Sequence, residues 1–234
     1  WMPKNAHAQH DDGPRNQICI AQPGMETWVR SWVPSGQNFG MVIRHGESYT
    51  MCKHLTVKNA DGTDAYRPTV HYAYHPSDVA IDSVLELRMR NWKMQDRERI
   101  LNNEIISGRD ELGVLLMGHD YKSWWTGSLL DIDQARSILP GQSATTLQVG
   151  GSVVAAVRWL LTYPTAGVCV PDDLPWRELL EWTSPYIGPL HSAAADWTPL
   201  SERFDPFPGF GNDDSLLDHS DPWQFANFLS PTPR

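Results

Sequence analysis

Residues 143–164, SATTLQVGGSVVAAVRWLLTYP, give the clearest helix signal in the chain. Apolar side chains occur almost all round the predicted helix, a pattern typical of a helix buried in the centre of a domain. Gly150 and Gly151 lie inside it and lower helix stability by roughly 1 kcal/mol each relative to alanine. We therefore expect a neighbouring backbone to pack closely against them.

Upstream of this helix the chain reads as short strands. In residues 26–33, ETWVRSWV, Trp28, Arg30 and Trp32 fall on one face, which is the period of a strand. Asp61 and Gly62 predict a hairpin turn. Further strands are expected at residues 39–50, FGMVIRHGESYT; 54–60, HLTVKNA; 65–74, AYRPTVHYAY; 98–107, ERILNNEIIS; 110–120, DELGVLLMGHD; and 122–131, KSWWTGSLLD. The first ~15 residues are expected to be irregular, because they are polar and lack a repeating pattern.

Helices surround these strands in the prediction. Ser77 is placed to cap a helix that buries Val79, Ala80, Val84 and Leu87 on one face. A short helix is expected after Asp131. Another is expected within residues 174–186, LPWRELLEWTSPY, and should end before Pro185. The sequence therefore predicts an α+β fold: a mostly antiparallel sheet, one buried helix and two or three covering helices.

Composition excludes several classes of protein. The 234 residues are 41% hydrophobic and 20% charged, and 19 basic against 28 acidic side chains give a net charge of −9. Such a chain is neither generally disordered nor suited to bind nucleic acid, which requires clustered Lys and Arg. The three cysteines form no CxxC pair, so a cytoplasmic location is expected. No membrane association is expected, because the longest apolar run, residues 153–161, is shorter than the ~20 residues of a span.

His45 and Glu47, in the segment RHGES, are the first candidate site. On a strand these two side chains would point to the same side. An imidazole beside a carboxylate can transfer protons and hold a cation. The alternative is a solvated strand end whose charge pair is incidental.

Two further segments contain chemically useful residues. Asp110 and Glu111 precede an apolar strand, where only one of them could face inwards, and the sequence pattern by itself favours a plain polar turn before a core strand. His71 and His75 lack a third ligand at a recognisable spacing, so no metal is expected and hydrogen-bonded histidines lining a sheet are favoured. The chain also has no GxGxxG or GxxxxGK[ST] loop that would cradle phosphate.

Together, these segments resemble the C-terminal half of the bacterial homospermidine synthase family, within the saccharopine-dehydrogenase-like superfamily. The resemblance covers essentially the whole chain in order. The residues that carry it are WMPKNA (1–6), QPGMETWVRSWVP (22–34), RHGESYT (44–50), YRPTVHYAYHP (66–76), DELGVLLMGH (110–119), ATTLQV (144–149), PDDLPWRELLE (171–181), PYIGPL (185–190), DWTPL (196–200) and DPWQFANFL (221–229).

The resemblance implies an activity and a site. The family uses NAD to join two putrescines, or putrescine and spermidine, into homospermidine, with release of ammonia or diaminopropane. His45 and Glu47 match the histidine and glutamate of the family's Thr-His-Asn-Glu-Ser segment and would be catalytic, with Glu47 also binding substrate. Asp110 matches an aspartate that holds a substrate amine. Gly46 departs from the family's asparagine, which removes a hydrogen-bonding side chain beside the pair.

The resemblance also implies an organisation. Residues 1–200 would form a substrate-binding and dimerisation domain, with residues 201–234 as an irregular tail packed on it. NAD would be held mainly by a Rossmann domain upstream of Trp1, so the isolated chain is expected to be inactive. The expected assembly is a cytoplasmic homodimer that acts on putrescine and related polyamines. The alternatives are a saccharopine- or carboxyspermidine-type dehydrogenase and an inactive dimerisation module.

Overall fold

The computed structural model describes residues 7–9, 18–20, 24–101, 103–203 and 217–230. The chain divides into two compact units. The first contains residues 1–93, 117–123 and 196–234, and the second contains residues 94–116 and 124–195. Residues 196–234 belong to the same unit as the N-terminal strands, and both units contain parts of residues 1–200.

An antiparallel sheet with strand order β11-β3-β4-β7 forms the centre of the first unit. In it, β3 (Trp28–Val33) pairs along its whole length with β4 (Gly36–Ile43), and β4 pairs with β7 (Tyr72–Tyr74). Val29 is fully buried. Gly40 allows close approach, since a Cβ there would lie 2.8 Å from the backbone of Ala73.

Two smaller strand pairs belong to the same unit. The hairpin predicted at Asp61 and Gly62 is confirmed, because β5 (Val57–Lys58) pairs with β6 (Asp64–Tyr66), and Gly62 adopts φ +86° in the turn between them. β1 (His7–Gln9) pairs with β2 (Ile18–Ile20), so the expectation of an irregular start is wrong for β1.

Two helices and one 3-10 turn accompany the sheet: α1 (Glu47–Leu55), α2 (Asp78–Met89) and η1 (Gly24–Glu26). The predicted cap is confirmed, since the Ser77 hydroxyl accepts a hydrogen bond from the Ala80 amide. α2 buries less than expected. Ala80, Val84 and Leu87 are half-buried, whereas Val79 is 78% exposed, because the face of α2 that carries Val79 has no packing partner in the described residues.

The described part of the C-terminal segment is tied to this sheet by buried polar side chains. α6 (Phe225–Phe228) leads into β11 (Leu229–Ser230), which pairs with β3. Asn227 is fully buried; its amide donates to three backbone carbonyls and accepts from the Asp218 amide. Arg30 donates to the carbonyls of Pro199 and Ser201, and burial lowers its pKa to about 10. The Asn227 bonds order the C-terminal segment itself, whereas the Arg30 bonds connect β3 to residues that lie far away in sequence.

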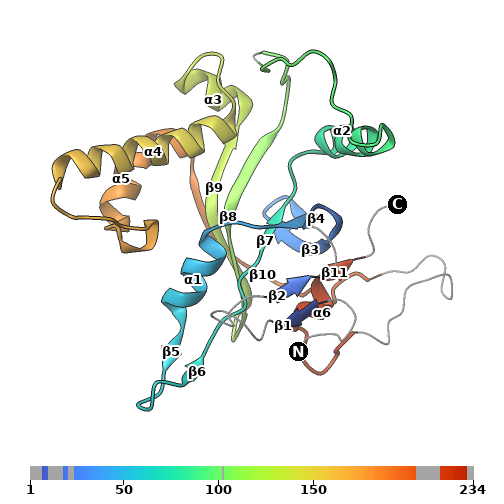
Figure 1. The fold of residues 1–234 in the computed structure, drawn as a ribbon, viewed down its shortest axis with the longest axis vertical. Helices are drawn as coiled ribbons and strands as arrows, with labels where there is room; N and C mark the ends of the chain where they lie inside the picture. Colours follow the sequence, from blue (N-terminus) through green and yellow to red (C-terminus); the bar gives the residue numbers. More distant parts are fainter. Residues whose placement is uncertain (1–6, 10–17, 21–23, 102, 204–216, 231–234) are drawn as a thin grey trace. The chain divides into compact units, whose positions relative to one another are not determined.

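A three-stranded sheet with order β10-β9-β8 underlies the second unit. β8 (Arg109–His119) and β9 (Lys122–Asp131) form a long hairpin, followed in the sheet by β10 (Leu190–Ala195) (Figure 1). Trp125 is 1% exposed, and a Cβ at Gly113 would lie 2.5 Å from its ring. The indole of Trp125 therefore packs over Gly113 of the neighbouring strand, at a position where only glycine fits.

Three helices and a 3-10 turn complete this unit: α3 (Ile132–Ile138), α4 (Ala144–Thr162), α5 (Trp176–Ile187) and η2 (Pro171–Asp173). The predicted start of α3 is confirmed, because Asp131 and Gln134 form a reciprocal capping box. Mixed α+β architecture with antiparallel sheets is therefore confirmed in both units.

The long helix α4 differs from the expectation of a fully buried helix. Its buried residues follow one face, which packs against α5, and Gln148 on this face donates to Ser128. A Cβ at Gly151 would lie 2.8 Å from Tyr186, whereas Gly150 faces open space. The opposite face remains exposed in this chain. It carries Val149, Val153, Val154, Val157, Leu160 and Leu161.

By length and composition, α4 is also the helix among the described residues that could cross a membrane. The buried helices of globular domains pass the same test. One face of α4 packs against α5, and the opposite face is exposed in this chain.

α5 continues through Pro185, where the prediction ended it. Proline has no N–H for the carbonyl four residues earlier, which here belongs to Glu181. The Ser184 hydroxyl donates to that carbonyl instead, at 2.9 Å. The helix ends two residues later, before Gly188 at φ +77°.

The strand expected at residues 98–107 is absent from the part of this segment that the structure describes. Ile100 and Ile106 are 90% and 86% exposed, so their apolar character does not reflect burial in this chain. A strand requires a hydrogen-bonded neighbour, and no described strand pairs with this segment.

Candidate functional site

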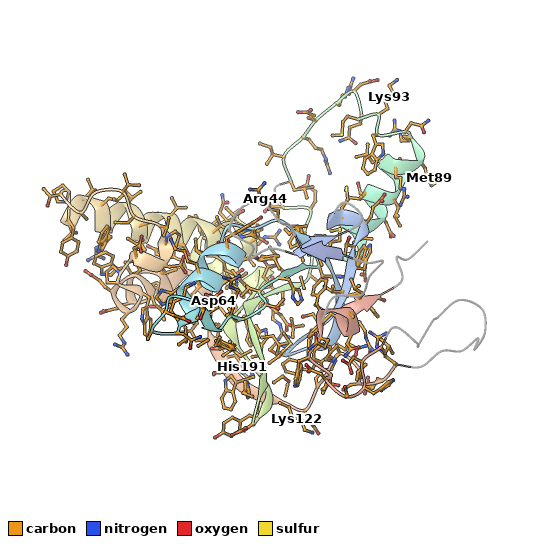
Figure 2. All side chains as sticks on the ribbon, turned by 60° about the horizontal axis from the view of Figure 1, so that its bottom comes forward. Arg44, Asp64, Met89, Lys93, Lys122 and His191 are labelled. Carbon is orange, nitrogen blue, oxygen red and sulfur yellow. The ribbon has the colours of Figure 1, made fainter. Side chains whose placement is uncertain are left out.

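The segment RHGES lies at the junction between β4 and α1, where Arg44 is labelled in Figure 2. It is not the strand that the sequence predicts. β4 ends at Ile43, and Gly46 has helical dihedral angles (φ −59°, ψ −37°). The amides of Ser48 and Tyr49 then donate to the carbonyls of His45 and Gly46. The chain therefore turns directly from strand to helix, and Glu47 begins α1.

The predicted pair nevertheless forms at this junction. His45 Nδ1 contacts the Glu47 carboxylate through Oε2. The two side chains keep 42% and 52% of their surface exposed, so the pair contributes little to folding stability. Among the residues that the structure describes, none bonds to the second ring nitrogen, Nε2. That nitrogen is therefore accessible to a ligand.

An aromatic side chain completes the arrangement. The imidazole of His45 stacks on the ring of Tyr72, with centroids 4.5 Å apart and planes 18° from parallel. Arg44, beside it in sequence, lies over Tyr49 at 5.8 Å. The sequence predicts a strand over residues 65–74 that contains Tyr72 and Tyr74, but it assigns them no role. Alternation of tyrosines is the only signal in the sequence, because the stack depends on how β4 and β7 pair.

Asp110 belongs to the second unit, whereas His45 and Glu47 belong to the first. It lies near the start of β8, where its carboxylate accepts a hydrogen bond from the Thr145 hydroxyl in the first turn of α4. A negative charge at this position stabilises the helix dipole. Glu111 pairs with Arg109. As adjacent residues of β8, Asp110 and Glu111 alternate between the two faces of the strand.

The histidines of the second candidate segment have structural partners. His71 lies edge-on to the rings of Phe225 and Phe228, at 5.3 and 5.4 Å, and burial lowers its pKa to about 4. His75 donates from Nδ1 to the Phe39 carbonyl oxygen at 2.8 Å. In the described ranges, no three His, Cys, Asp or Glu side chains gather as metal ligands.

The saccharopine dehydrogenase C-terminal domain family matches residues 2–196. The chain belongs to this family. As a member of it, the chain is also similar to two homospermidine synthases, from Blastochloris viridis (46% identity) and Mesorhizobium japonicum (43% identity). Each similarity covers 98% of this chain but 47% and 46% of the relative, so the chain spans about half the length of the curated relatives it matches.

A solved structure gives the same result. The crystal structure of the homospermidine synthase from Legionella pneumophila, in complex with NAD, matches this saccharopine dehydrogenase C-terminal domain with a TM-score of 0.89 and 38% identity. The match covers 98% of this chain and 49% of that one. The protein is therefore related to homospermidine synthases over nearly its whole length.

The N-termini of the longer helices in the described residues do not suit the pyrophosphate of NAD. Helix N-termini bind phosphate when their first turn offers free amides and no negative charge. α1, α2 and α5 carry Glu47, Asp78 and Glu178 in their first turns. At α4, the carboxylate of Asp110 already contacts the first turn. These four positions repel a pyrophosphate.

Proposed function

We propose that this chain supplies the amine-binding and proton-transfer residues of a homospermidine synthase. The reaction would condense two putrescines, or putrescine and spermidine, into homospermidine and release ammonia or diaminopropane. The observation that carries the proposal is the contact between His45 and Glu47, which leaves Nε2 accessible, in a chain 43–46% identical to homospermidine synthases. The proposed location is the cytoplasm.

Glu47 is suited to bind a cation. The substrates carry two or more positive charges near neutral pH, and a carboxylate that is half exposed can accept a charge-assisted hydrogen bond from an ammonium group. Such a bond contributes about 1.5–3 kcal/mol. We propose that Glu47 holds one ammonium or iminium nitrogen. We propose that Asp110 holds an amine as a separate contribution from the second unit.

His45 is suited to move the protons of the condensation. An ammonium must lose a proton before its nitrogen can add to the imine carbon of the other substrate. The departing nitrogen must gain a proton before its bond to that carbon breaks and ammonia leaves. A histidine whose Nδ1 is held by Glu47 can accept the first proton at Nε2 and return it in the second step. The carbon–nitrogen bond formed balances the one broken.

We propose that NAD, which supplies the redox chemistry of the family, is bound outside this chain. The support is the acidic first turns described above and the share of the relatives that the chain leaves unmatched. Titration calorimetry should therefore detect no tight binding of NAD by this chain. Tight binding would contradict this part of the proposal.

The test of function is product formation by the complete protein. With putrescine and NAD, we expect homospermidine and ammonia in equal amounts and no net accumulation of NADH. Net NADH formation with a carboxylate-bearing amine would favour the saccharopine- or carboxyspermidine-type alternative instead. A complete absence of turnover with either substrate class would favour a module that serves only dimerisation.

We further propose that the protein forms a homodimer through the β8 sheet. In the described sheet β8 is an edge strand, and Leu112, Val114 and Leu116 on one of its faces are 44%, 39% and 46% exposed. An edge strand with alternating apolar residues is self-complementary to a second copy. Val114→Lys should shift the mass measured by light scattering from dimer to monomer. Val168→Lys, at a fully exposed position in a loop, is the matched control and should not.

A further inference from the structure

Tyr72 is brought to His45 by strand pairing. In the register of β4 and β7, Tyr72 lies opposite Ile43, the last residue of β4. His45 follows two residues later, just beyond the end of β4. The register therefore brings Tyr72 beside the segment that carries His45, and there the two rings stack with their centroids 4.5 Å apart.

The stack on Tyr72 restricts a rotation of the His45 imidazole that the contact with Glu47 still allows. His45 lies in a short linker and its side chain is 42% exposed, so few neighbours limit its rotation. A hydrogen bond at Nδ1 fixes one edge of the imidazole, but the ring can still rotate about that bond. A parallel ring against its face fixes the plane. The two contacts together define where Nε2 points.

We infer that Tyr72 is a positioning residue for His45. It holds the imidazole plane so that Nδ1 faces Glu47 and Nε2 faces the ligand. The aromatic face carries out this role and the phenol hydroxyl is not required. The catalytic consequence rests on the proposed function, whereas the orientation of the ring does not.

Tyr74 provides a matched control on the same strand. It lies on the same face of β7 and its ring is tilted against Tyr72 at 6.2 Å. It is 38% exposed, and in the described residues it has no ring contact with a histidine. A change to leucine removes a similar aromatic surface at either position. Of the two tyrosines, Tyr72 stacks on His45, and comparison with Tyr72→Phe, which keeps the ring, isolates that stack.

The kinetic test compares three variants of the complete protein in homospermidine formation. Tyr72→Leu should lower kcat by about 10- to 100-fold, because a misplaced catalytic group costs up to about 10²-fold. KM should change less than kcat. Tyr72→Phe should restore kcat to within about threefold of the wild type, and Tyr74→Leu should stay in the same range. Equal losses for both leucine variants, or for Tyr72→Phe and Tyr72→Leu, would overturn the inference.

A spectroscopic readout separates this inference from the proposed function. Nitrogen NMR shifts of the His45 ring, measured in the same proteins at about pH 8.5 where histidine is ordinarily neutral, report which nitrogen carries the proton. The Nδ1–H form should dominate in the wild type and in Tyr72→Phe, and both tautomers should be populated in Tyr72→Leu. Unchanged shifts in Tyr72→Leu would overturn the inference. If the wild type makes no homospermidine, the proposed function fails, and these shifts still decide the role of Tyr72.

Discussion

The first unit contains two histidine–carboxylate pairs of similar construction. His45 precedes α1 and contacts Glu47 in its first turn. His75 precedes α2, and its Nε2 lies 3.3 Å from the Asp78 carboxylate in the first turn of that helix. Both pairs are partly exposed, and both place a negative charge where it stabilises the helix dipole. By sequence spacing the two pairs are hard to tell apart.

They differ in the second ring nitrogen. His75 has both nitrogens engaged, because Nδ1 lies 2.8 Å from the Phe39 carbonyl oxygen. His45 engages only Nδ1 within the described residues, and its face is held by Tyr72. A histidine with two protein partners connects elements of the fold, whereas one with a nitrogen to spare can exchange a proton with a ligand. This difference, rather than the presence of a pair, identifies the candidate site.

The largest expected effect comes from replacing each of the two histidines with asparagine in turn. His45→Asn should lower kcat/KM for homospermidine formation by about 10²- to 10³-fold, since proton transfer by a positioned side chain contributes at least about 10²-fold. His75→Asn should leave kcat/KM within about threefold and instead lower the melting temperature. The measurements are steady-state kinetics and thermal unfolding of the complete protein. Equal kinetic losses in both variants would remove the distinction between the pairs.

The carboxylates provide a second, smaller contrast. Glu47→Gln keeps the shape of the side chain but removes the charge that would hold an ammonium, so kcat/KM should fall about 10- to 100-fold. Asp78→Asn removes the same charge from the other pair, where the carboxylate is 93% exposed, and should leave the rate unchanged. Both variants should unfold at nearly the wild-type temperature. A wild-type rate for Glu47→Gln would refute its role in substrate binding.

A third histidine, His71, has no carboxylate partner among the described residues, and burial lowers its pKa, so it extends the comparison to pH. The pKa of His71 is lowered to about 4 in the folded state, against about 6.5 in an unfolded chain. As the pH falls below about 6.5, the unfolded state therefore takes up a proton first. Stability should be lost between about pH 6.5 and pH 4, by about 2 kcal/mol at pH 5.

His71→Phe should abolish this part of the acid sensitivity while leaving stability near pH 7 similar. Urea unfolding at pH 7 and pH 5 measures the difference. His54→Asn, at an exposed position of α1, is the control and should keep the wild-type pH dependence. An equal loss of stability in His71→Phe and the wild type would show that other groups cause the acid sensitivity.

The smallest expected effect concerns Asp110. Asp110→Asn weakens its interaction with the first turn of α4, which should cost about 0.3–1 kcal/mol of stability, and it should lower kcat/KM about tenfold if the carboxylate also holds an amine. Thr145→Val removes the hydrogen-bond donor but keeps the carboxylate. A loss of rate in Asp110→Asn but not in Thr145→Val would support amine binding by Asp110. Similar losses in both variants would assign Asp110 a structural role.

Features determined within a few residues of chain were predictable from the sequence. The turn at Gly62, the cap at Ser77 and the capping box at Asp131 all form between neighbours in sequence, so the residue types suffice to indicate them. The α+β class follows similarly from the periodicity of the segments. His45 and Glu47 were also found this way, although on an expected strand. Two side chains this close in sequence can meet in either conformation.

Only the tertiary structure decided the remaining features, because each depends on a partner distant in sequence. The apolar residues of α4 could not show which face packs against α5 and which stays exposed. Pro185 read as a helix end, yet the Ser184 hydroxyl occupies the carbonyl that proline leaves without a donor. Tyr72 reaches His45 only through the register of β7 on β4. Residue types and their order set the local conformations, whereas the pairing of strands and the packing of helices determine which side chains meet.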